Sequence, residues 1–121
     1  MGEPIRVLHI LQRMEAGGTQ ALLMNIYRKI DRTKVQFDFW VVYKEKQFYD
    51  DEIESMGGHV YKLSFREDLN LPKFQKDLKN LFKQHHEYQI VHCHAYTIGY
   101  FCLKAAKKAG IPVRIAHSHN N

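Results

Sequence analysis

Short apolar segments alternate with amphipathic ones along the chain, and this alternation restricts the possible folds more than any other feature of the sequence. Segments typical of buried strands lie at residues 5–11, 35–43, 59–63, 88–92 and 112–117. Segments with helical periodicity lie between them, at residues 19–30, 48–56, 70–84 and 97–109. Strands joined by helical crossovers form parallel sheets with right-handed connections. The sequence therefore predicts a doubly wound α/β domain with strand order 3-2-1-4-5.

The first expected helix shows how the amphipathic pattern is assigned. Thr19 offers a hydroxyl to cap its amino end. Its apolar stripe is predicted to contain Leu22, Leu23, Ile26, Tyr27 and Ile30. We expect this stripe to pack on the sheet.

The size and composition fit one globular domain covering residues 1–121. The chain has a mass of 14.3 kDa and 45% apolar residues, which is enough for a core of its own. It contains no apolar run that could span a bilayer, and its amino end shows no leader cleavage site. Cys93 and Cys102 do not form a disulfide framework, so a cytoplasmic location is expected.

The net charge of +5 is unevenly distributed along the chain. Residues 1–71 contain ten Lys and Arg against eleven Asp and Glu, whereas residues 72–121 contain eight against two. A basic half indicates an anionic partner such as a phosphorylated molecule or a lipid surface, or simply a solvated lysine face. Nucleic acid is not favoured, because the cations are mostly Lys with few aromatic residues between them.

In a doubly wound sheet, ligands bind outside the carboxyl ends of the strands, where the strand order reverses. This rule selects residues 13–19, 92–96 and 117–121 as neighbours in space. Gly17, Gly18 and Thr19 lie between a strand and a helix, where free amides and the helix dipole favour phosphate. A tight turn without a ligand is the alternative, since neither a Walker loop nor a GxGxxG motif is present.

Two His-x-His sequences follow the fourth and fifth strands. His92 and His94 should point to one face, as should His117 and His119, with Cys93 buried on the opposite face. These histidines can hydrogen-bond sugar hydroxyls or phosphate oxygens. They could also ligate zinc, but no Asp or Glu accompanies them, so we assign neither a metal nor a cofactor.

Several segments together resemble a known family. In chain order they are IRVLHIL, GGTQ, ALLMNIYRKID, VQFDFWVVY, FYDDEIESMGGHVYKL, IVHCHAYTIGY and IPVRIAHSHN. Their order and spacing resemble the N-terminal, acceptor-side domain of glycosyltransferase family 4 enzymes of the bacterial capsular and exopolysaccharide type. That resemblance implies a Rossmann-like domain that forms half of a GT-B fold.

The resemblance also implies an activity and roles for particular residues. Family members are retaining enzymes that move a sugar from a nucleotide-sugar to a lipid-linked or polysaccharide acceptor. His119 matches a family histidine beside the transferred sugar and is the candidate catalytic residue. The residues implied to bind substrate are Gly17, Gly18, Thr19, His94, Tyr96 and His117. Gln20 stands where the family commonly has an acidic residue, so a charged contact is not expected there.

The family's nucleotide-sugar-binding domain has no counterpart in these 121 residues. The resemblance therefore implies a truncated N-terminal domain with little or no transferase activity alone. It also implies an acceptor at the inner membrane face, where Lys73, Lys76, Lys79 and Lys83 on one helix could contact anionic lipid.

Two other functions remain as alternatives. A nicotinamide-binding domain would place an acid after the second strand, and Glu45 lies there, but the glycine spacing does not fit. A stand-alone binding or regulatory module of the receiver type would have acidic residues after the first strand. Leu11, Gln12 and Arg13 stand there instead.

Overall fold

The computed structural model describes residues 3–11, 18–41, 45–62, 71–85, 87–94 and 99–117. Five parallel strands form one sheet in the order β3-β2-β1-β4-β5. The strands are β1 (Ile5–Leu11), β2 (Val35–Val41), β3 (Val60–Lys62), β4 (Tyr88–Cys93) and β5 (Val113–Ala116). The helices are α1 (Gly18–Lys29), α2 (Asp50–Ser55), α3 (Leu71–Gln84) and α4 (Gly99–Lys108). The predicted fold class and strand order are confirmed.

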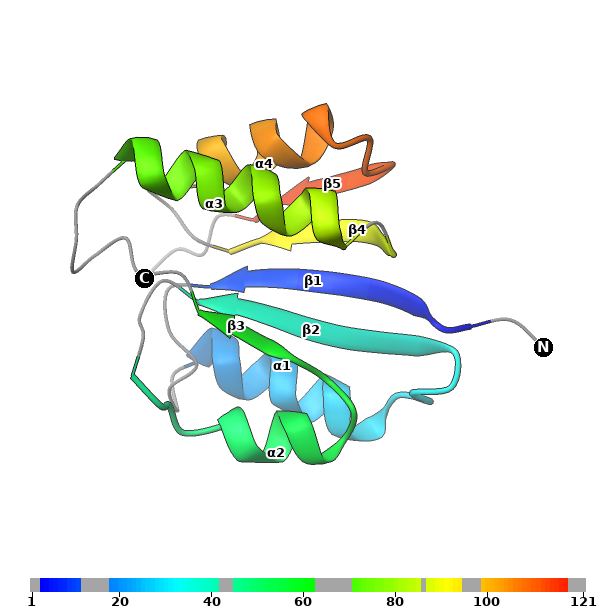
Figure 1. The fold of residues 1–121 in the computed structure, drawn as a ribbon. Coiled ribbons are helices and arrows are strands. Elements are labelled where there is room, and N and C mark those ends of the chain that lie inside the picture. Colours follow the sequence, from blue (N-terminus) through cyan, green and yellow to red (C-terminus); the bar gives the residue numbers. More distant parts are fainter. Residues whose placement is uncertain are drawn as a thin grey trace.

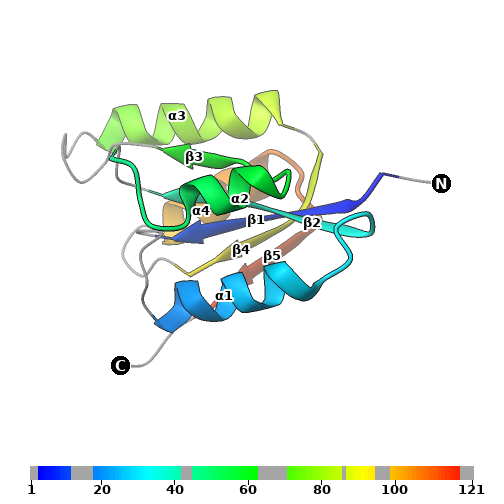
Figure 2. The same cartoon turned by 90° about the horizontal axis from the view of Figure 1, so that it is seen from below.

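Helices cover both faces of this sheet. Helices α1 and α2 lie on one face, and α3 and α4 lie on the other (Figure 1). The view from below shows α1 running alongside the strands, with its first residues near their carboxyl ends (Figure 2). Strand β1 lies at the centre of the sheet, and its last five residues are all buried. This double coverage explains why its sequence is almost continuously apolar.

Two apolar cores hold the layers together. One packs Leu8, Ile10 and Trp40 against α3 and α4, and it includes both cysteines. The other packs Val7 and Leu11 against α1 and α2. Cys93 therefore takes the buried position that the sequence predicts, and Trp40 is buried in the same core.

The apolar stripe of α1 differs from the prediction. Leu22 is 56% exposed and Ile26 is 41% exposed, whereas Met24 is fully buried with Leu23 and Tyr27. Residues i, i+3 and i+4 share a helix face, so a face centred on Leu23 and Tyr27 turns Leu22 and Ile26 away from the sheet. The helix also begins at Gly18, so Thr19 lies within its first turn rather than before it.

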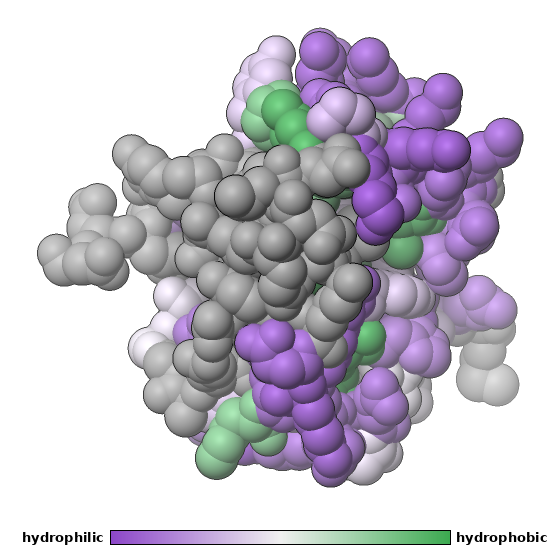
Figure 3. All heavy atoms as spheres, turned by 60° about the vertical axis from the view of Figure 1, so that its left-hand side comes forward, coloured by the Kyte–Doolittle hydropathy of each residue, from purple (hydrophilic) through white to green (hydrophobic). Residues whose placement is uncertain are grey.

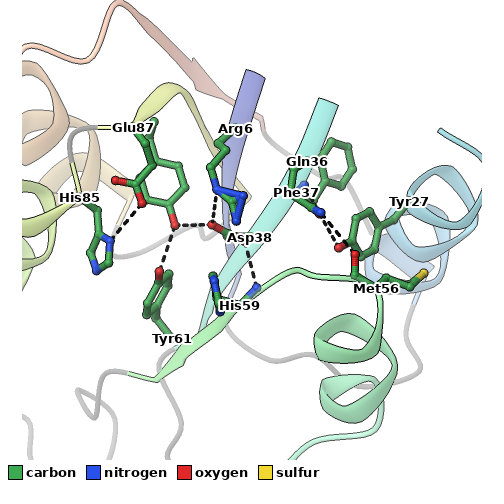
Figure 4. Close-up of polar contacts among 11 residues, drawn as sticks. Arg6, Tyr27, Gln36, Phe37, Asp38, Met56, His59, Tyr61, His85 and Glu87 are labelled. Atoms are coloured by element: carbon green, nitrogen blue, oxygen red, sulfur yellow. Dashed lines mark hydrogen bonds and ion pairs between the residues drawn. The ribbon is translucent and has the colours of Figure 1, made fainter. Parts of the chain in front are cut away.

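Both faces of strand β2 are buried. Asp38 is completely buried on the α3 and α4 side, where Tyr88 Oη donates to its Oδ2 at 2.5 Å. Arg6 Nε lies 3.4 Å from the same oxygen, and the His59 backbone N–H donates to Oδ1 at 2.9 Å. Figure 4 shows Arg6 from β1 and His59 from just before β3 on either side of Asp38 from β2. The carboxylate of Asp38 is therefore paired despite its burial.

No helix in the described part of the chain is both long enough and apolar enough to cross a membrane.

Candidate functional site

The carboxyl ends of β1, β4 and β5 lie side by side, and their backbones are tied together just beyond the strands. The His94 N–H donates to the Ile10 carbonyl at 2.8 Å, and the His117 N–H donates to the Cys93 carbonyl at 3.0 Å. His94 therefore follows β4 directly beside β1, and His117 follows β5 directly beside β4. The described parts of two of the three segments that the topology selects, residues 92–94 and residue 117, are therefore adjacent, as predicted.

Three predicted histidines form a cluster at this edge. The rings of His92 and His94 stack with centroids 4.0 Å apart and planes inclined by 23°. The ring of His117 lies 5.4 Å from that of His92 and 5.6 Å from that of His94. His92 Nε2 and His117 Nδ1 are 3.3 Å apart. As the alternation predicts, His92 and His94 share one face while Cys93 is buried in the core of α3 and α4.

A fourth histidine, His9, joins the cluster, and the sequence analysis missed it. His9 pairs in register with His92 and is only 3% exposed. Its Nδ1 lies 3.1 Å from His94 Nε2, and its ring packs on Phe37 and Phe39 with centroids 4.3 and 5.5 Å away. The available signal was a histidine inside a nearly continuous apolar strand, which the predicted topology places beside β4.

Burial determines the protonation of His9. Desolvation lowers the pKa of His9 well below its usual value, and nearby positive charge on His94 or His92 lowers it further. His9 is therefore neutral at physiological pH. Its Nε2 is buried and has no hydrogen-bond partner among the residues that the structure describes.

The amino end of α1 supplies the second element of the site. Gly18 begins the helix and is exposed, and a Cβ added there would meet nothing within 4 Å. Thr19 is half-buried in the same turn, which contains no acidic residue. Free backbone N–H groups in the first turn of a helix can bind an anion. The first turn of α1 is thus chemically suited to a phosphate.

Three predicted site residues, Gly17, Tyr96 and His119, lie outside the described residues. The structure therefore places Gly18, Thr19, His94 and His117 and leaves the other three as predictions. The thiol between the two histidines is not a further candidate. Cys93 is 2% exposed, and a hydrogen bond with Cys93, together with burial, raises the pKa of Cys102 well above its usual value.

The assembled site offers several imidazole nitrogen atoms at the carboxyl edge of the sheet, near which α1 begins (Figure 2). One ligand atom from each of His9, His92 and His94 lies within 4.8 Å of the other two. Neutral imidazoles donate one hydrogen bond, accept one, or ligate a metal ion. The arrangement can therefore orient hydroxyl groups, contact phosphate oxygens or hold a cation.

Comparison with known proteins gives one similarity. The chain is 40% identical over 116 residues to a protein of Bacillus subtilis (strain 168) named "Putative glycosyltransferase EpsF". The match covers 95% of this chain but only 30% of the relative's length. No family model matches the chain, and no solved structure matches it.

Proposed function

We propose that this chain is the acceptor-side, N-terminal part of a glycosyltransferase that acts in cell-surface polysaccharide synthesis. The observation that carries the proposal is the 40% identity, over 95% of the chain, to a relative named as a glycosyltransferase. The finer proposal is a retaining GT-B enzyme of family 4. It would transfer sugar from a nucleotide-sugar to a lipid-linked or polysaccharide acceptor.

The site chemistry supports this proposal. Sugar transfer develops negative charge on the leaving diphosphate and positive charge on the sugar. Backbone amides at Gly18 and Thr19 are suited to stabilise the diphosphate, because they lie in the first turn of α1. Gly17 precedes these residues in the sequence, and we propose that it also contacts the donor diphosphate or the transferred sugar.

The histidines have the complementary role of positioning sugar hydroxyls. His94 and His117 lie next to each other at the carboxyl edge of the sheet, with ring centroids 5.6 Å apart. We propose that they bind the acceptor together with Tyr96. His119, the candidate catalytic residue, would lie beside the transferred sugar.

The proposal is tested on the enzyme that contains this chain together with a donor-binding domain. His117→Ala should lower kcat/KM about 10-fold or more, because an imidazole hydrogen bond to substrate contributes about 1.5 kcal/mol. His59→Ala is the matched control, because His59 is exposed and precedes β3 at the opposite edge of the sheet. Equal activity of the two variants would refute the assigned role.

Residues 1–121 alone should give no sugar transfer, because the donor-binding domain would supply the other half of the active site. Normal turnover by residues 1–121 would contradict an active site shared between two domains.

The exposed face of α3 supports a contact with the cytoplasmic face of a membrane. Lys73, Lys76, Lys79 and Lys83 are all exposed, while Phe74, Leu78 and Phe82 point into the core. One of these lysines, Lys73, lies 3.3 Å from Asp77. The part of the molecule above the sheet, where α3 and α4 lie, carries many hydrophilic residues (Figure 3). We propose that these four lysines bind anionic lipid.

Vesicle sedimentation tests the membrane contact. Each lysine near an anionic surface contributes about 1 kcal/mol, so changing all four to Gln should lower the partition coefficient at least about 100-fold. Changing Lys29, Lys34, Lys107 and Lys108 to Gln removes the same charge from outside α3. This control should lower the partition coefficient less. Equal loss in the two variants, or equal binding of the unmodified protein to neutral vesicles, would contradict the proposal.

A further inference from the structure

We propose that His9, His92, His94 and His117 form a binding site for a transition metal ion of the zinc class. This inference goes beyond the proposed transferase activity and is argued from the geometry of the cluster alone, although it includes His94 and His117, which are also proposed to contact the acceptor. His9 comes from β1, His92 from β4 and His94 from the residue after β4, and these three form one group. His117, the residue after β5, contacts His92 of this group.

The spacing of the ring nitrogens supports coordination. Zinc binds imidazole nitrogen at about 2.0–2.1 Å in tetrahedral sites, which places two ligand nitrogens roughly 3.3 Å apart. His9 Nδ1 and His94 Nε2 are 3.1 Å apart, and His92 Nε2 and His117 Nδ1 are 3.3 Å apart. Two pairs of nitrogens therefore already have the separation of metal ligands.

The backbone holds these histidines in place. His9 and His92 are paired in the register of β1 and β4. The backbone N–H groups of His94 and His117 are hydrogen-bonded to the neighbouring strands at 2.8 and 3.0 Å. Only side-chain rotations are then needed to bring the ligands together, so the folded sheet preorganises the site.

The chemistry of the group selects the class of ion. The group of described residues that could hold an ion consists of histidines, and imidazole suits Zn²⁺, Co²⁺, Ni²⁺ and Cu²⁺ rather than Mg²⁺ or Ca²⁺. His9 can ligate through Nδ1, which faces His94, or through the buried Nε2, which has no hydrogen-bond partner among the described residues.

A cation fits this cluster. A metal ion binds the unprotonated nitrogen of an imidazole, and one such atom from each of His9, His92 and His94 lies within 4.8 Å of the other two. The two close pairs of ring nitrogens, 3.1 and 3.3 Å apart, have the spacing of ligands that surround one cation. His117 is exposed, so an ion at the cluster can be reached from solvent.

Metal titration of the purified, metal-free protein tests the inference. We expect one equivalent of Zn²⁺ in calorimetry and a tetrahedral Co²⁺ absorption spectrum in the visible range. The double variant His92→Ala/His94→Ala should bind Zn²⁺ at least about 10-fold more weakly, since even indirect disturbance of a metal site costs that much. The double variant His59→Ala/His85→Ala removes two histidines outside the cluster and should bind like the unmodified protein.

Two further measurements keep the test decisive. His117→Asn changes an exposed residue after β5, so it should weaken Zn²⁺ binding and shift the Co²⁺ spectrum even if the double variant unfolds. Inorganic phosphate, which the first turn of α1 is suited to bind, should not displace Zn²⁺ from the cluster. The inference is overturned if no Zn²⁺ binds, if the cluster and control variants bind equally, or if phosphate binds and Zn²⁺ does not. None of these measurements uses sugar transfer. The outcome for Zn²⁺ binding is therefore the same whether or not the proposed transferase activity is found.

Discussion

Replacing Asp38 with Ala should lower the free energy of unfolding by about 3–5 kcal/mol, the usual cost of removing one partner from a buried ion pair. Asp38 is completely buried and accepts hydrogen bonds from Tyr88 Oη and the His59 backbone N–H. Its removal leaves the His59 N–H without its acceptor and leaves Tyr88 Oη only the longer bond to Tyr61 Oη at 3.4 Å. The Arg6 guanidinium, whose side chain is only 21% exposed, loses its carboxylate. Unsatisfied buried groups lose water without recovering a bond.

The partner Tyr88 gives this prediction a second measurement. Burial raises the pKa of Tyr88 far above its usual value, and the hydrogen bond to Asp38 raises it further, so the phenol remains a donor. Tyr88→Phe should therefore cost less than Asp38→Ala, because it leaves Arg6 and the His59 amide paired with the carboxylate. A double-mutant cycle should show coupling between the two substitutions, since they share one bond.

Urea denaturation followed by circular dichroism measures these free energies. The control is Asp51→Ala, because Asp51 is 82% exposed and its pair with Lys46 lies at the surface. Exposed pairs contribute about 0–1 kcal/mol. If Asp38→Ala destabilised the protein no more than Asp51→Ala, the buried network would not be a determinant of stability.

Gly58→Ala is the second substitution with a large expected effect. A Cβ at Gly58 would lie 2.6 Å from Tyr27 Oη, 2.7 Å from the Phe37 carbonyl oxygen and 2.9 Å from Ile53 Cγ2. The carbonyl belongs to the backbone of β2, and Ile53 is completely buried. Neither group can move without disturbing the core, so we expect a loss of about 1–3 kcal/mol or more.

Moving Tyr27 would not relieve this clash cheaply. Tyr27 Oη donates to Gln36 Oε1 at 2.5 Å, and its ring stacks on that of Phe37 with centroids 5.4 Å apart. Figure 4 shows Tyr27, Gln36 and Phe37 lying beside α2. Gln36 Nε2 also donates to the carbonyl of Met56, which follows α2. A displaced Tyr27 would lose both interactions.

Thermal and urea denaturation of Gly58→Ala and Gly18→Ala give the comparison for this prediction. Gly18 is the matched control, because a Cβ there meets nothing within 4 Å. Its substitution should change stability by less than about 0.5 kcal/mol. Equal stability of the two variants would show that α2 moves away from β2 at little cost.

Local pattern was sufficient to predict the fold but not its buried polar groups. The alternation of strands and helices determined the sheet order because few topologies satisfy right-handed, uncrossed connections. The environment of Asp38 could not be predicted, since its partner Tyr88 is 50 residues away in the sequence. The exposure of Leu22 also depends on how α1 is rotated against the sheet, which five apolar positions in one helix do not determine.

The histidine cluster was predicted in part for the same reason. Strand alternation and topology together placed His92, His94 and His117 near one another, because neither inference needs side-chain packing. His9 was overlooked because its strand was assigned entirely to the core, although its register with His92 follows from the predicted strand order. The positions of Gly17, Tyr96 and His119 stay predictions.

The central position of β1 affects how the chain folds during synthesis. One edge of β1 pairs with β2, which is translated soon afterwards, but the other edge pairs with β4, where Val7 meets Ile90. Until residues 88–93 leave the ribosome, β1 is an open, apolar edge of a three-stranded half-sheet. Such edges favour intermolecular pairing. A nascent chain paused before β4 should therefore be more prone to aggregation than one released after β5.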